Sequence, residues 1–141
     1  MLLTWILWPA GTASDATEPT LRFTQMLSTS ILPAVLDISE DGSKIAYYDE
    51  IAHVLDLATG QTTDLPGTES STVVEFSPDG DWLLLTKTVS IDRVPVRGGT
   101  PVEIVRSTEG GPRANWGPDD WIVFEDVQNV FRYSESRNEL F

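Results

Sequence analysis

The chain has 141 residues, 22 of them acidic and 9 basic, with a net charge of −13 and no cysteine. This length fits one ordinary domain of about 100–200 residues, while the charge argues against nucleic-acid partners and anionic membrane surfaces, which both attract clustered Lys and Arg. Without cysteine the chain can form no disulfide, thiolate zinc site, iron–sulfur cluster or thiol nucleophile, and its one histidine excludes a His-rich metal site.

The first segment, MLLTWILWPA at 1–10, is almost wholly apolar. It is too short for a helical membrane span of about 20 residues. A secretory signal begins with basic residues, but no basic residue precedes Arg22 in this chain. Three interpretations stay open: a signal-like apolar leader, the end of a membrane helix with Trp5 and Trp8 at the interface, or an apolar tail. Residues 11–20 are small, polar and acidic with proline, and they predict a linker.

From Leu21 onward, short apolar runs separated by turn-forming residues predict β-strands. One motif occurs three times, as LDISEDG at 36–42, VEFSPDG at 74–80 and ANWGPDD at 114–120. Its central aspartates, Asp41, Asp79 and Asp119, are 38 and 40 residues apart. A period of about 40–45 residues is typical of the four-stranded blades of β-propellers.

Each repeat predicts four strands, the first two joined by a tight turn in which Pro presets φ, Asp tolerates the bridge region and Gly supplies positive φ. The expected strands are 34–38, 44–48, 52–57 and 61–65, then 72–76, 82–86, 89–94 and 101–105, then 113–116, 121–125, 129–133 and one starting near Asn138. The fourth strand is the more polar one, as an outer strand facing solvent should be. Residues 21–27 predict one further strand, of which 22–26 could pair with the last blade to close a ring.

The predicted fold class is therefore all-β: an incomplete β-propeller of about three four-stranded antiparallel blades, at 34–66, 72–106 and 113–141, within a propeller region of 21–141 that includes the N-terminal strand. Complete propellers have about 4–8 blades, and stacked repeats need covered end faces. We therefore expect a fragment, a truncated reading frame, or a protomer that completes its ring by association.

The repeats resemble the WD-repeat-like blades of TolB-type β-propellers, whose signature is a strand, Ser-Pro-Asp-Gly and an apolar strand. The segment 77–80 matches that signature fully, and 40–42 and 118–120 match it in part. An apolar start, a linker and Leu21-Arg22-Phe23-Thr24 also resemble the region after the membrane helix in some bacterial receptor-type serine/threonine kinases. That resemblance implies an extracytoplasmic sensor or interaction propeller, although the chain carries no kinase motif.

No residue set in the sequence predicts catalysis, a metal site or a cofactor site. His53 has no identifiable partner, and a Gly-x-Ser-x-Gly nucleophile motif is missing, so Ser-His-Asp catalysis is not supported. The turn aspartates lack the spacing of a calcium loop; they are Asp41, Asp79, Asp81, Asp119 and Asp120. Adjacent carboxylates point to opposite faces of a strand, which argues against a glycosidase pair; the pairs are Asp49/Glu50 and Glu125/Asp126.

The tryptophans Trp82, Trp116 and Trp121 could line a carbohydrate or peptide site, but their positions favour packing in blade cores. The segment 110–113 is expected to be an inter-blade turn, because no helix follows it to bind a phosphate. The acidic excess could steer cationic partners, and it also keeps a β-rich surface soluble.

These observations predict a non-catalytic propeller segment that binds a protein or peptide and belongs to a larger periplasmic or extracytoplasmic protein. A membrane anchor at its N-terminus is one interpretation of the apolar segment at 1–10. We expect no enzyme activity, no cofactor and no nucleic-acid partner. Any remaining blades would come from further chain or from self-association. Two alternatives are the accessory propeller of a serine peptidase and a TolB-type periplasmic envelope protein.

Overall fold

The computed structural model describes residues 25, 36–107, 112–125, 129–134 and 139–140. The predicted leader at 1–10, the linker at 11–20 and the N-terminal strand at 21–27 lie outside the described residues, apart from Gln25, which belongs to no strand. The described part is all-β and contains three four-stranded antiparallel sheets, each built from consecutive strands. The predicted fold class is therefore confirmed.

Each sheet is one of the predicted repeats, and we call the sheets blades 1 to 3. Blade 1 contains β1 (Leu36–Ile38), β2 (Lys44–Asp49), β3 (Ile51–Asp56) and β4 (Thr62–Leu65). Blade 2 contains β5 (Ser71–Phe76), β6 (Trp82–Lys87), β7 (Ser90–Pro95) and β8 (Val102–Arg106). Blade 3 contains β9 (Arg113–Trp116), β10 (Trp121–Glu125), β11 (Val130–Ser134) and β12 (Glu139–Leu140), with a short 3-10 helix, η1 (Pro118–Asp120), between β9 and β10.

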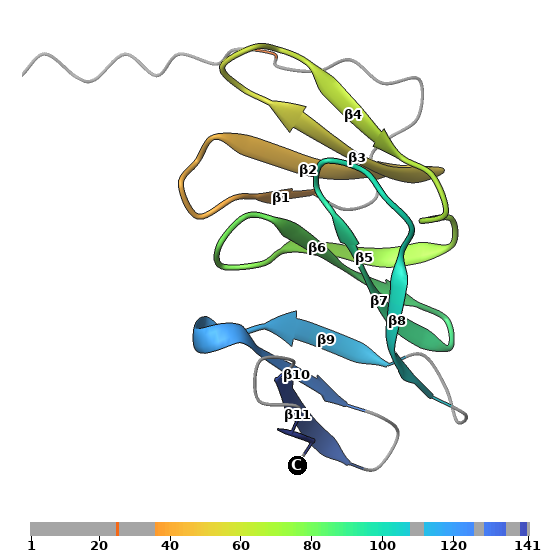
Figure 1. The fold of residues 1–141 in the computed structure, drawn as a ribbon. Coiled ribbons are helices and arrows are strands. Elements are labelled where there is room, and N and C mark those ends of the chain that lie inside the picture. The colour runs from red at the N-terminus through yellow and green to blue at the C-terminus, as the bar shows by residue number, and fades with distance from the viewer. Residues whose placement is uncertain (1–24, 26–35, 108–111, 126–128, 135–138, 141) are drawn as a thin grey trace, which may run out of the picture.

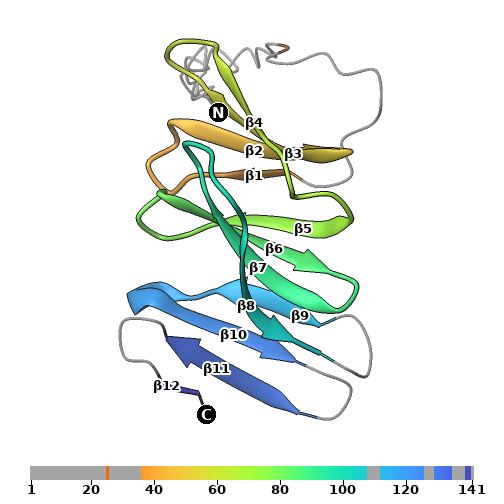
Figure 2. The ribbon, with the colours of Figure 1, turned by 45° about the vertical axis from the view of Figure 1, so that its right-hand side comes forward.

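The blades stack face to face along the molecule, from blade 1 through blade 2 to blade 3 (Figures 1 and 2). Their first strands, β1, β5 and β9, are edge strands that lie next to one another in the stack. Because side chains alternate between the faces of a strand, each blade has one face toward the preceding blade and one toward the following blade. We call these the leading face and the trailing face.

Apolar side chains fill the space between neighbouring blades. Ala46, Ala52 and Val54 on the trailing face of blade 1 form one buried cluster with residues of the leading face of blade 2, among them Val74, Phe76, Leu83, Leu85 and Val94. A second cluster joins the trailing face of blade 2 to blade 3, and it includes Leu84, Ile91, Ala114, Ile122 and Phe124. The middle strand β6 of blade 2 is therefore apolar on both faces, as a blade packed between two others requires.

The turns that join the first two strands of each blade differ at the position of their last glycine. Gly42 and Gly80 occupy positive φ, at 69° and 70°, as the turn chemistry predicts. In blade 3 the same position is Asp120, which adopts a φ of 64°. Asp119 before it is also left-handed, at 59°, and not in the bridge region expected of that aspartate. Aspartate tolerates this region better than most residues, so the turn survives without glycine.

Candidate binding surface between blades 2 and 3

The first two turns are closed by a serine and an aspartate. In blade 2 the Ser77 hydroxyl donates to Asp79 Oδ1 at 2.5 Å, and the Ser77 Oγ accepts from the Trp82 amide at 3.0 Å. Ser39 makes the equivalent bonds to Asp41 and Lys44 in blade 1. The hydroxyl of Ser39 holds the pKa of Asp41 down at about 2, and that of Ser77 lowers the pKa of Asp79. Both carboxylates are thus ionised and committed to their own turns.

The turn of blade 3 differs from the other two. Gly117 stands where the other blades have serine, so no hydroxyl closes the turn. Its amide donates to the Trp121 carbonyl at 2.6 Å, as the serine amides of the other two blades donate to the corresponding carbonyls. No serine hydroxyl engages Asp119 as Ser77 engages Asp79 in blade 2, and Asp119 and Asp120 both line the groove described next, together with Arg93. These two carboxylates are therefore not held within their own turn by a hydroxyl.

We call the end of a blade that carries the turn between its first two strands its turn end. A groove with a volume of about 390 Å³ runs between the turn ends of blades 2 and 3. Pro78, Trp82 and Trp116 supply its apolar wall, while Asp119 and Asp120 lie on the blade 3 side. The indole Nε1 of Trp116 is buried and has no hydrogen-bond partner among the described residues. The groove therefore combines aromatic surface with carboxylates, which suits a chain carrying both apolar and cationic side chains.

An arginine covers the outer indole of this groove. The Arg93 guanidinium lies 4.1 Å from the ring centre of Trp82, and Arg132 lies 4.3 Å from that of Trp121 in blade 3. Trp82, Trp116 and Trp121 are all half-buried, and Trp116 packs against the core cluster between blades 2 and 3. The expectation of core packing thus holds for Trp116, while the other two form cation–π pairs because a third-strand arginine is diagonal to each.

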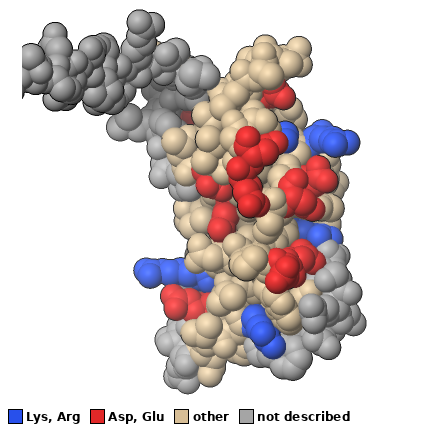
Figure 3. All heavy atoms as spheres, turned by 90° about the vertical axis from the view of Figure 1, so that its left-hand side faces the viewer, with Lys and Arg blue, Asp and Glu red and all other residues tan. Residues whose placement is uncertain are grey.

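Acidic side chains gather on the side of the molecule where the turns between the first two strands lie. In the view onto this side they cover the middle of the face, and basic side chains lie mostly around them (Figure 3). The turn acids include Glu40, Asp41, Asp79, Asp81, Asp119 and Asp120. Such a face attracts cationic partners and repels nucleic acid.

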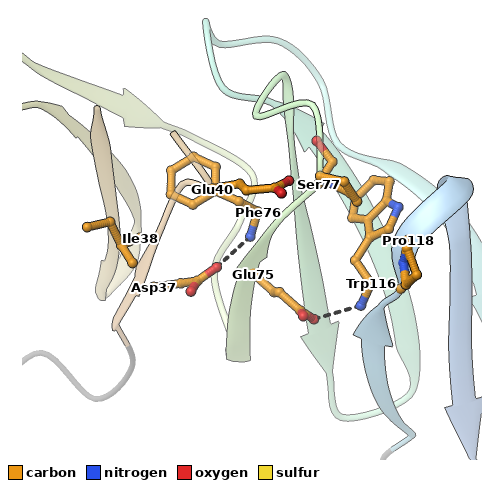
Figure 4. Close-up of a pocket in the computed structure, with 10 residues that line it drawn as sticks. Asp37, Ile38, Glu40, Glu75, Phe76, Ser77, Trp116 and Pro118 are labelled. Atoms are coloured by element: carbon orange, nitrogen blue, oxygen red, sulfur yellow. Dashed lines mark hydrogen bonds between the residues drawn. The ribbon is translucent and has the colours of Figure 1, made fainter. Parts of the chain in front are cut away.

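A second hollow of about 270 Å³ lies beside this groove, where the first strands of the three blades meet. Here Asp37 Oδ2 accepts from the Phe76 amide at 2.8 Å, and Glu75 Oε2 accepts from the Trp116 amide at 2.9 Å (Figure 4). Both amides belong to edge strands, so a carboxylate of the preceding blade supplies the partner that the sheet does not. These bonds set the position of Trp116 in the groove.

The carboxyl of Glu75 has a raised pKa. Burial is the largest cause of this increase, and the nearby charge of Asp37 raises the pKa further, while the hydrogen bonds from the Trp116 amide and from Asn115 lower it.

The sequence analysis did not single out Asp37 and Glu75. The signal was their shared place in the repeat, since Asp37, Glu75 and Asn115 each stand two residues before the Ser or Gly of the turn.

His53 has a partner that the sequence did not reveal. Its Nδ1 lies 2.9 Å from Asp64 Oδ1 on the neighbouring strand β4, and its ring stacks on Tyr47 at 4.8 Å. Its Nε2 lies 3.3 Å from the Asp49 carbonyl. The histidine is held by these three contacts on a blade face, which agrees with the structural role expected of it.

The acidic pairs do not form a two-carboxylate centre among the described residues. Asp49 ends β2, and Glu50 forms the turn to β3 with a φ of 66°. Glu125 ends β10, and Asp126 lies outside the described residues. In the same described part, no group of three or more His, Cys, Asp or Glu could hold a metal ion, and no helix is long and apolar enough to cross a membrane. Of the predicted turn at 110–113, only Pro112 and Arg113 are described.

No protein-family model and no curated protein matches the chain. Among solved structures it is similar to TolB from Acinetobacter baumannii, with 21% identity and a TM-score of 0.63 over 82% of this chain and 33% of that one. It is also similar to a putative TolB from Agrobacterium tumefaciens, with 19% identity and a TM-score of 0.63 over 82% of this chain and 47% of that one. The chain thus has a TolB-like β-propeller fold and spans between a third and a half of these proteins.

Proposed function

We propose that this chain is a non-catalytic propeller segment that binds a protein or peptide partner in the groove between blades 2 and 3. The observation that carries the proposal is the turn of blade 3. Gly117 removes the hydroxyl that engages the aspartate in blades 1 and 2, and so Asp119 is not tied to its turn by a hydroxyl. Asp119 and its neighbour Asp120 both line the aromatic groove.

The chemistry of the groove selects the partner. An apolar side chain fits against Pro78 and Trp116, and a neighbouring Lys or Arg reaches the carboxylates of blade 3. The acidic turn face around the groove raises the encounter rate with such a partner. The partner is therefore a cationic, partly apolar segment of a protein.

Fluorescence titration tests this proposal. The probe is a peptide of alternating lysine and leucine, read through the groove tryptophans, with a peptide of alternating glutamate and leucine as its control. In the Asp119→Asn/Asp120→Asn variant, asparagine keeps the left-handed backbone while both charges are lost. We expect binding of the basic peptide to weaken about five- to tenfold, because exposed ion pairs contribute modestly.

A matched variant separates local binding from general charge attraction. Asp64→Asn/Glu103→Gln removes two charges from the outer strands β4 and β8, away from the groove. This variant should bind the basic peptide as the unaltered chain does. Equal weakening in both variants, or equal binding of the acidic peptide, would contradict a site in the groove.

The likeness to TolB structures favours a second candidate, a TolB-type periplasmic envelope protein. Both candidates place the propeller outside the cytoplasm, either soluble or anchored at its N-terminus. Because the chain has no cysteine, Val89→Cys introduces a single thiol at an exposed turn. In cells whose outer membrane is permeabilised and whose inner membrane is intact, we expect a membrane-impermeant maleimide to label that thiol. A thiol that is labelled only after the inner membrane is broken would contradict this location.

A further inference from the structure

The blade stack has two end faces, the leading face of blade 1 and the trailing face of blade 3. Each resembles the faces that pack against a neighbouring blade inside the stack. The sheet registers align the blades residue by residue, so that positions 36 and 38 of blade 1 correspond to 74 and 76 of blade 2. Leu36 and Ile38 are 65% and 57% exposed on the leading face of blade 1, whereas Val74 and Phe76 are 2% and 6% exposed.

The trailing face of blade 3 shows the same contrast. Val123 and Val130 correspond to Leu84 and Ile91 in blade 2. The blade 2 residues are 1% and 0% exposed inside the stack, while Val123 and Val130 are 43% and 70% exposed. Four of the large apolar side chains exposed in the described part of the chain therefore occupy positions that another blade buries in the interior of the stack.

The hydrogen bonds that join the first strands of neighbouring blades also repeat from blade to blade. Asp37 accepts the Phe76 amide, and Glu75 accepts the Trp116 amide. The next acceptor in the series is Asn115 on the edge strand β9, and the corresponding amide at the other end of the stack is that of Ile38 on the edge strand β1. An amide oxygen at position 115 can accept such a bond as a carboxylate does.

The charges at the turn ends are also complementary. Between blades 1 and 2, Lys44 and Asp81 line one groove, and between blades 2 and 3, Arg93 lines another with Asp119 and Asp120. Arg132 is the blade 3 counterpart of Arg93. The turn that would face it across the next interface is the acidic one of blade 1, Glu40-Asp41.

We propose that the leading face of blade 1 packs on the trailing face of blade 3 in a second copy of this chain. Two copies related by a two-fold axis then supply six blades, which lies within the range of about 4–8 blades in closed propellers. The occupant of each end face is the opposite end face of the partner, so the contact is head-to-tail and occurs twice.

Sedimentation velocity and light scattering test the proposal on the full chain. The unaltered chain should have twice the mass of one 15.6 kDa copy. Ile38→Asp and Val123→Asp each place a charge on one end face, at exposed positions that do not affect folding within a blade, and each should give a monomer. Val89→Asp, in the exposed turn between β6 and β7, is the matched control and should remain a dimer.

Cross-linking then tests the direction of packing. With no native cysteine, an Ile38→Cys copy mixed with an Asn115→Cys copy should form a disulfide between chains, and neither variant alone should do so. A monomer at every concentration overturns the proposal, and so does a dimer that Val123→Asp leaves intact. Cross-linking of Ile38→Cys to itself would show pairing of two leading faces and overturn the head-to-tail arrangement.

Discussion

Glu75 links blade 2 to blade 3 through one hydrogen bond, and its replacement tests how that interface is held. Glu75→Ala removes the acceptor of the Trp116 amide, which lies at the free edge of β9. A buried donor without a partner costs about 1–3 kcal/mol. Trp116 is half-buried, so water satisfies part of the loss. We expect the free energy of unfolding to fall by about 1–2 kcal/mol.

Glu75→Gln keeps the acceptor and removes the charge. Because burial and Asp37 raise the pKa of Glu75, the folded state disfavours the carboxylate at neutral pH. When folding raises the pKa of an acid, stability falls as pH rises from the unfolded pKa to the folded pKa, because only the folded state holds the proton in that range. The same stability returns as pH falls back through that range. Glu75→Gln should therefore be more stable than the unaltered chain at neutral pH, and the gain should vanish below the ordinary value of 4.5.

Urea unfolding followed by tryptophan fluorescence at neutral and acidic pH measures both effects. Asp64→Asn is a suitable control, since that carboxylate lies on the exposed strand β4 away from the interface. If Glu75→Gln destabilised the protein at neutral pH as much as Glu75→Ala, the negative charge would be favourable there. The argument from burial and from Asp37 would then be refuted.

Three further predictions concern the turns, the indoles and the core. Gly80→Ala should cost about 1–2 kcal/mol in the free energy of unfolding, since φ is 70° and the nearest atom to an added Cβ is 4.0 Å away, which leaves only backbone strain; a neutral result would show that the turn relaxes. Arg93→Met should cost about 0.5–1 kcal/mol and shift the emission of Trp82, whereas Arg93→Lys should keep part of both; an unchanged spectrum would argue against the stacked guanidinium. Leu84→Ala should cost about 2–5 kcal/mol in thermal or urea unfolding, because this side chain is fully buried between blades 2 and 3; a loss like that of a surface substitution would place it outside the core.

The strands were predictable because their signals are local. Alternating apolar residues and turns rich in Pro, Asp and Gly place the twelve strands within about two residues, including β12, which begins one residue after the expected Asn138. The repeat period then orders them into blades without any knowledge of contacts. The polar outer strands β4 and β8 followed from the same pattern.

The candidate site was harder to predict because it depends on which residues face each other across blades. The partnership of His53 with Asp64 needs the register of β3 and β4, and the bond from Glu75 to the Trp116 amide spans 41 residues. Replacement of the turn serine by Gly117 was visible in the sequence, but its consequence for Asp119 and Asp120 follows only from the hydroxyl contacts in the other two blades.

Amide hydrogen exchange by NMR tests most directly how the blades are joined. Phe76 and Trp116 lie on edge strands, where amides that point away from the sheet exchange quickly unless a partner protects them. With carboxylates of the preceding blade as their acceptors, both amides should exchange as slowly as those paired inside the sheets, and Asp37→Ala should release Phe76 alone. Rapid exchange of both amides in the unaltered chain would contradict the inter-blade hydrogen bonds on which the groove and the end faces depend.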